Sequence, residues 1–126
     1  MPTIDLTKSE IDVMRILWNA GEDLSLQEIL KRTEDVYQKQ WKRQTLSTFL
    51  THLIDKGMLQ SYRIGRVFYY RVIVDKDEYK RLTAKHVLDY WYDGSKSDFV
   101  AALFKNEKMT KEKKDKVREL IDELDD

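Results

Sequence analysis

Four short, uncharged polar side chains recur on one face of a segment near the middle of the chain. Gln44, Ser47, Thr48 and Thr51 are spaced as i, i+3, i+4 and i+7, which brings them together on one side of an α-helix. Glutamine can pair bidentately with adenine, serine and threonine can contact bases or phosphates, and the threonine methyl can touch thymine. The spacing therefore predicts a helix face that reads base edges in the major groove of DNA. The alternative interpretation is an ordinary solvated helix face.

Basic residues before this helix and in the hairpin after it favour the DNA interpretation. Gly65 marks the tip of the predicted hairpin, and Arg63, Arg66 and Arg71 surround it. Cationic side chains that contact phosphates fix the register of a protein on DNA, and the free N–H groups of a helix start also attract phosphate. The candidate phosphate contacts are Lys39, Lys42, Arg43, Thr45, His52, Arg63 and Arg66.

Apolar periodicity places this polar face on the third of three N-terminal helices. Capping boxes beginning at Thr7 and Ser25 mark the starts of the first two helices, and Gly57 ends the third. We expect helices at residues 8–19, 26–34 and 43–56, a short strand at 23–24, and hairpin strands at 59–63 and 67–72. Three more helices are expected, from a cap near Asp75 to about residue 92, at 96–105 and at 111–124. The order predicts a mainly α protein with a small β-hairpin, in which a winged helix-turn-helix (residues 1–73) precedes a three-helix dimerisation region (residues 74–126).

The distribution of charge supports a local DNA-binding surface on a neutral protein. The 126 residues carry 23 basic and 23 acidic side chains, a net charge of zero. Residues 38–71 hold seven basic side chains and one acidic, whereas residues 1–37 hold four basic and eight acidic. A basic patch of this kind can bind phosphates while the remaining surface resists nonspecific contacts.

The three C-terminal helices are short and strongly charged, and each has a narrow apolar stripe. About 50 residues of this kind make a thin core alone, so we expect their apolar side chains to be buried against a second copy of the chain. The predicted dimerisation residues are Leu88, Trp91, Val100, Leu103, Phe104, Val117, Leu120, Ile121 and Leu124.

Catalysis, cofactor binding and membrane insertion are not predicted. Cysteine is absent, and the two histidines, His52 and His86, stand 34 positions apart on different predicted helices, so no metal site is expected. No nucleophile triad, glycine-rich phosphate loop or carboxylate pair stands out. No apolar run reaches the roughly 20 residues of a membrane span, and no signal peptide is evident, so we expect a cytoplasmic protein that is not an enzyme.

Four motifs, in order, resemble the penicillinase-repressor family of winged-helix transcriptional regulators (the BlaI/MecI/CopY family). Residues 10–18 read EIDVMRILW and resemble the family's E-x-x-V-M-x-I-x-W. Trp41 followed by residues 45–57 resembles W-x-x-x-T-[VI]-x-T-L-L-x-x-L-x-x-K-G. Residues 65–70 (GRVFYY) resemble the wing motif G-R-x-x-x-Y, and residues 94–103 resemble G-S-x-x-x-L-V-x-x-L.

This resemblance implies a homodimer that binds a palindromic operator and represses the genes behind it, which in the best-known members confer β-lactamase or penicillin resistance. In those members a membrane-bound sensor protease triggers cleavage in the C-terminal region, and Ala102-Leu103 stands where they have the Asn-Phe cleavage bond. The missing cysteines argue against the copper-sensing branch. The resistance repressors carry Arg and Lys where this chain has Ser47 and Gln44, which predicts a different operator sequence.

Two other functions are compatible with the same elements. One is a ligand-sensing winged-helix regulator with a pocket lined by Tyr90 and Trp91. The other is a winged helix that serves as a protein-interaction module. The interaction module does not require the basic hairpin or the polar third helix, both of which are present.

Overall fold

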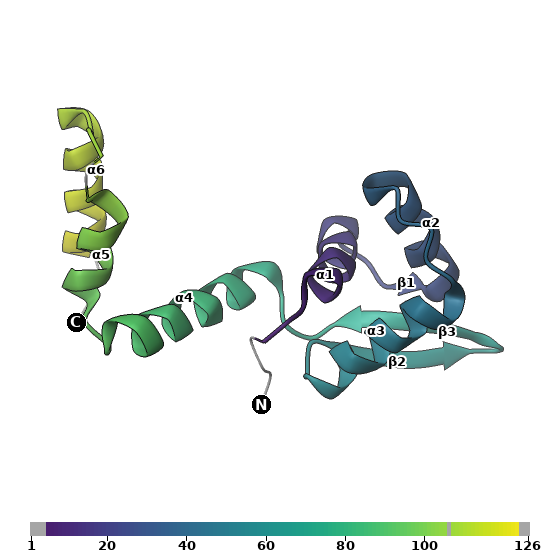
Figure 1. The fold of residues 1–126 in the computed structure, drawn as a ribbon. Coiled ribbons are helices and arrows are strands. Elements are labelled where there is room, and N and C mark those ends of the chain that lie inside the picture. Colours follow the sequence, from purple (N-terminus) through teal and green to yellow (C-terminus); the bar gives the residue numbers. More distant parts are fainter. Residues whose placement is uncertain (1–4, 106, 124–126) are drawn as a thin grey trace. The chain divides into compact units, whose positions relative to one another are not determined.

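The computed structural model describes residues 5–105 and 107–123, and the elements appear in the expected order (Figure 1). They divide into two compact units, residues 1–86 and 87–126. The described part is mainly helical with one small antiparallel sheet, so the predicted winged-helix class is confirmed. The elements are α1 (Lys8–Ala20), β1 (Leu24–Ser25), α2 (Leu26–Tyr37), α3 (Arg43–Asp55), β2 (Leu59–Ile64), β3 (Val67–Val72), α4 (Lys76–Tyr92), α5 (Lys96–Phe104) and α6 (Lys111–Glu123).

Side-chain caps fix where the first two helices begin. The side chains of Thr7 and Ser25 each accept a hydrogen bond from the backbone N–H three residues later. The carboxylates of Glu10 and Glu28 accept in turn from the backbone N–H of the cap residue, which completes both capping boxes. The expected end of α2 near residue 34 was wrong by three residues. The helix continues until Gln38, whose φ of 54° supplies the left-handed cap that glycine usually provides.

Strand β1 joins the hairpin of β2 and β3, which we call the wing, to form one three-stranded sheet in the first unit. Its strand order is β1-β3-β2, and β2 pairs with β3 from Leu59 opposite Val72 to Ile64 opposite Val67. Gly65 and Arg66 form the two-residue turn. Gly65 has a φ of 61°, and a positive φ at only the first central residue is the pattern of a type II′ turn. The short strand expected at residues 23–24 forms one residue later, where it pairs with β3.

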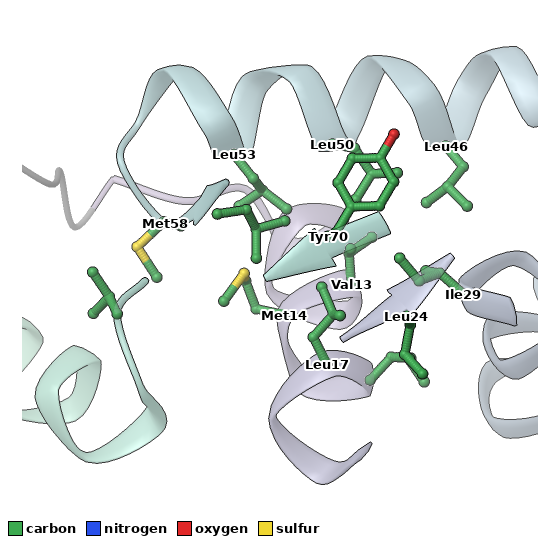
Figure 2. Close-up of a cluster of buried hydrophobic side chains, with 13 residues drawn as sticks. Val13, Met14, Leu17, Leu24, Ile29, Leu46, Leu50, Leu53, Met58 and Tyr70 are labelled. Atoms are coloured by element: carbon green, nitrogen blue, oxygen red, sulfur yellow. The ribbon is translucent and has the colours of Figure 1, made fainter. Parts of the chain in front are cut away.

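The core of the first unit lies between α1, α3 and the sheet. Figure 2 shows that leucines of α3 point toward α1 and Tyr70 of β3. Each of these side chains is at least 93% buried. Burying a leucine in such a core contributes about 1.5–3 kcal/mol, so the apolar stripe of α3 fixes which of its faces remains outside. The buried residues shared by α1, α3 and β3 include Val13, Met14, Leu17, Leu46, Leu50, Leu53 and Tyr70.

The first turns of α4 belong to the first unit. The Trp18 indole N–H donates to the carbonyl oxygen of Val74 at 3.0 Å, and the Trp18 and Tyr79 ring centroids lie 5.5 Å apart. Tyr79 and Leu82 also pack against the core. The first unit therefore extends beyond residue 73, at which the sequence analysis ends the winged helix-turn-helix.

The second unit leaves much of its apolar surface exposed. None of the described residues from 87 to 123 is buried, although the Tyr92 and Phe99 rings stack at 5.2 Å. Trp91 is 71% exposed and Leu103 is 56% exposed, and Leu120 and Ile121 are also exposed. Leu124 lies outside the described residues. Within residues 5–105 and 107–123, no helix combines the length and apolar character needed to cross a membrane.

Candidate nucleic-acid interface

The polar face of α3 lies opposite its buried leucines. Gln44, Thr48 and Thr51 are exposed, and Ser47 is half-buried beside them. The Thr48 hydroxyl donates to the carbonyl of Gln44 at 3.0 Å, and the Thr51 hydroxyl donates to that of Ser47 at 2.9 Å. Because each hydroxyl proton is used within the helix, both threonines present acceptor lone pairs and a methyl group to the outside. Such a face suits a thymine methyl or an amino group of adenine or cytosine.

The N-terminal end of α3 is basic and open. Lys42 occupies the N-cap position, and its side chain accepts no hydrogen bond from the first turn. The N–H groups of that turn are therefore not capped by Lys42. Thr45 is half-buried in this turn, and Lys42 is exposed. The positive end of the helix dipole strengthens the attraction of this end for phosphate.

Arg43 joins this end of α3 to the neighbouring helix. One of its terminal nitrogens donates to Oε1 of Gln27 in α2 at 2.6 Å, and the Arg43 side chain remains exposed. Lys39, which precedes α3, is half-buried. Lys42 and Arg43 therefore lie at the N-terminal end of the polar face, and the bond to Gln27 of α2 restrains Arg43.

The wing carries its two central arginines at an exposed, partly apolar tip. Arg66 occupies the turn itself, and the Arg63 guanidinium lies 5.7 Å from the centre of the Phe68 ring. Such a cation–π contact restrains Arg63 without neutralising its charge. The exposed apolar residues at this tip, Ile64 and Val67, were not anticipated. Ile64 and Val67 pair with each other across the two strands. The alternation of side chains predicts that these segments are strands, but it does not predict which face of the hairpin is left uncovered.

Arg71 does not contribute to the tip as its place in the sequence indicated. Its guanidinium pairs with Oδ2 of Asp23 at 3.2 Å and lies 5.0 Å from the centre of the Tyr62 ring. The Tyr62 hydroxyl donates to the same carboxylate oxygen at 2.6 Å. This hydrogen bond to Asp23, burial and the Asp23 charge raise the pKa of Tyr62 above its usual value. Arg71 is therefore engaged where the sheet meets the α1–β1 loop.

His52 lies beside a buried carboxylate that the sequence analysis missed. Its Nδ1 is 3.5 Å from Oε2 of Glu10, and Oε1 of Glu10 accepts from Lys56 Nζ at 2.6 Å. Burial alone would raise the pKa of Glu10, but hydrogen bonds from Lys56 and from the Thr7 backbone N–H, with the charges of Lys56 and His52, hold it below its usual value. The capping box pointed to Glu10 as a helix cap, but no local pattern connected it with α3.

The C-terminal candidates fall on three helices, and all described members are exposed or half-buried. Val100, Phe104 and Val117 line an open hollow of about 200 Å³ between α5 and α6, together with Met109. Ala102 and Leu103, which the family resemblance aligns with a cleavage bond, are exposed on α5. In the described part of the chain, no three His, Cys, Asp or Glu side chains gather as a metal site would require.

Comparisons with known proteins agree with this arrangement. The family model described as penicillinase repressor matches residues 6–123. The penicillinase repressor of Bacillus licheniformis is 25% identical over 118 residues, which cover 94% of this chain and 90% of that protein. The methicillin resistance regulatory protein MecI of Staphylococcus aureus (strain N315) is 24% identical over 119 residues, which cover 94% of each chain.

Among solved structures, the DNA-binding domain of the repressor BlaI is similar to part of this chain. It aligns with a TM-score of 0.53 and 29% sequence identity, and the match covers 62% of this chain and 93% of that domain. The chain belongs to the penicillinase repressor family, whose members are DNA-binding transcriptional repressors rather than enzymes.

Proposed function

We propose that this protein is a homodimeric repressor that binds a palindromic operator by placing α3 of each subunit in the major groove. The observation that carries this proposal is the polar face of α3. Gln44, Thr48 and Thr51 are exposed, while the opposite face is fixed in the core by Leu46 and Leu50. The helix can therefore meet the groove only with these side chains outward, and each can form a base contact.

Phosphate contacts would flank this base-reading face on both sides. The open first turn of α3 with Lys42 and Arg43 lies at one end, and Arg66 at the wing tip supplies a second basic site. These contacts fix register and contribute most of the salt-dependent affinity. Under this proposal residues 1–73 form the DNA-binding domain and residues 74–126 form the dimerisation domain.

The exposed apolar side chains of the C-terminal helices support the dimer. Trp91, Leu103, Leu120 and Ile121 are each at least 47% exposed in one chain. Burial of such residues between two copies would remove this surface from water. Two α3 helices linked in this way would read half-sites about one helical turn of DNA apart.

Induction would act on the linkage between subunits. Ala102 and Leu103 are exposed on α5, and a cut between them would separate α6 from the rest of the chain. We propose β-lactamase or penicillin-resistance genes as targets, repressed in the cytoplasm and released when a membrane-bound sensor protease triggers this cut. Incubation with such a protease, followed by sedimentation, tests this induction by cleavage. We expect a cut chain that sediments as a monomer, and a chain left intact would exclude induction by cleavage.

A titration of the full-length protein against its own upstream region tests the function. A DNA duplex with both half-sites should bind far more tightly than one with a single half-site, because linkage raises the effective concentration of the second contact and strengthens binding about 10²–10⁴-fold. Equal affinity for the two duplexes, or a monomer in sedimentation at the same concentration, would contradict the dimeric repressor.

A further inference from the structure

A buried carboxylate lies directly behind the DNA-facing helix. Glu10 of α1 has only 2% of its side chain exposed. Its Oε1 accepts from the Thr7 backbone N–H at 2.9 Å and from Lys56 at 2.6 Å, and its Oε2 faces His52 Nδ1 at 3.5 Å. A buried carboxylate that is fully partnered is held in one place, so it can orient the ring that it faces.

His52 continues the row of base-reading residues on α3. Gln44, Thr48 and His52 follow one another as i, i+4 and i+8 and so form one ridge on the helix surface. His52 lies about 6 Å beyond Thr48 along the helix axis. Its side chain is 54% exposed, and among the described residues its ring has no hydrogen-bond or ion-pair partner other than Glu10. The Nε2 side of the ring is therefore available beside the polar face.

We propose that His52 binds a DNA backbone phosphate in its protonated form, with Glu10 behind it as the positioning carboxylate, so that binding of DNA takes up a proton. This inference rests on the proposed function, because it requires α3 to lie in the major groove. His52 would then contribute affinity rather than sequence reading, since a phosphate is present at every position of DNA.

The surrounding charges determine the sign of the effect. Glu10 of α1 faces the ring with a negative charge, whereas Lys56, the C-cap of α3, shares that carboxylate and brings a positive charge. Asp55 is adjacent on α3, and Asp5 presents its backbone carbonyl to Lys56. A phosphate near Nε2 adds negative charge on the open side of the ring. Under this proposal a bound phosphate favours the charged ring, so we expect the affinity for DNA to be higher at about pH 6 than at about pH 8.

The test is the affinity of the full-length protein for operator and for random duplex DNA at about pH 6 and about pH 8, at constant ionic strength. We expect both duplexes to bind about three- to tenfold more tightly per half-site at the lower pH. His52→Gln should abolish this gain, because glutamine retains a polar group without titrating. His52→Arg should bind tightly at both pH values. His86→Gln, which changes the other histidine, should retain the gain.

Two outcomes distinguish this inference from the function on which it rests. If operator binding is salt-dependent but equal at both pH values, or if His52→Gln keeps the gain, the proton-linked contact is wrong and the repressor proposal stands. If no duplex binds at any pH, the proposed function itself falls. A purely structural role for His52 would lower the melting temperature of His52→Gln and weaken binding equally at both pH values, which would also overturn the inference.

Discussion

The ammonium nitrogen of Lys56 lies 2.6 Å from Oε1 of Glu10 and so joins the C-cap of α3 to the first turn of α1. The contact crosses 46 positions of sequence and involves a carboxylate that is almost entirely buried. Hydrogen bonds from two different elements to one buried carboxylate restrict how the two helices can move against each other. The orientation of α3 therefore depends on residues outside its polar face.

Removal of the Lys56 charge should destabilise the first unit. Lys56→Met leaves Glu10 with the Thr7 N–H and His52 but without its shortest contact, so we expect the free energy of unfolding to fall by about 1–3 kcal/mol in urea titrations. Lys31→Met is the matched control, because its pair with Asp35 is exposed and 3.8 Å long. That variant should change stability by less than about 0.5 kcal/mol. Equal losses of stability in the two variants would show that the buried Lys56–Glu10 pair stabilises the fold no more than an exposed pair does.

Stability should also fall in acid because of Glu10. Its pKa in the folded protein lies below its ordinary value of 4.5, so the carboxylate stabilises the fold above about that pH, and the contribution is lost as pH falls through the lowered value. Glu10→Gln should be less stable than the wild type near neutral pH, and the difference should shrink as pH falls below about 4.5. Urea midpoints measured across this range check the prediction, and a constant difference would contradict it.

Substitutions of Thr48 should separate its methyl contact from its acceptor contact. Its hydroxyl proton is already donated to Gln44, so Thr48→Val keeps the methyl and loses the acceptor, whereas Thr48→Ser does the reverse. The variant that removes the group that contacts the base should reduce the difference in binding free energy between operator and random DNA by about 1–3 kcal/mol. Parallel titrations on both DNAs give this gap, and no change in either variant would remove Thr48 from the base-reading face.

Two truncated chains should differ in stability because α4 begins on the first unit. A fragment of residues 1–86 keeps the Trp18–Tyr79 ring contact and the packing of Leu82, whereas residues 1–73 lose both. We expect both to fold, with the longer fragment more stable by about 1–3 kcal/mol. Both should be monomeric in sedimentation and bind operator far more weakly than the full chain. Equal melting of the two would show that the start of α4 adds nothing to the core.

Local patterns were sufficient to predict most of the fold. The capping boxes at Thr7 and Ser25 and the apolar stripe of α3 depend on neighbours within a few residues, and the structure confirms them. The predicted end of α2 was wrong because Gln38 adopts the left-handed conformation, for which glutamine has no strong preference. Turn chemistry could not reveal this choice, since it depends on how the following segment returns to the core.

The environment of the candidate site was harder to predict than its members. The exposed polar face of α3 follows from helical spacing, but the Glu10–His52 and Arg71–Asp23 pairs join residues 42 and 48 positions apart. Only tertiary packing brings such charges together. A count of basic residues therefore treats Arg71 and Arg66 alike, although Arg71 pairs with Asp23 and Arg66 stands in the turn.

The salt dependence of operator binding tests the central claim most directly. If the dimer makes roughly 6–8 phosphate contacts, the logarithm of the association constant should fall with the logarithm of salt concentration at a slope of about −5 to −7. Arg66→Ala should weaken binding to all sequences and make this slope about two units shallower per dimer, whereas Arg71→Ala, already paired with Asp23, should leave it nearly unchanged. A slope near zero for the wild type would contradict DNA binding through α3 and the wing.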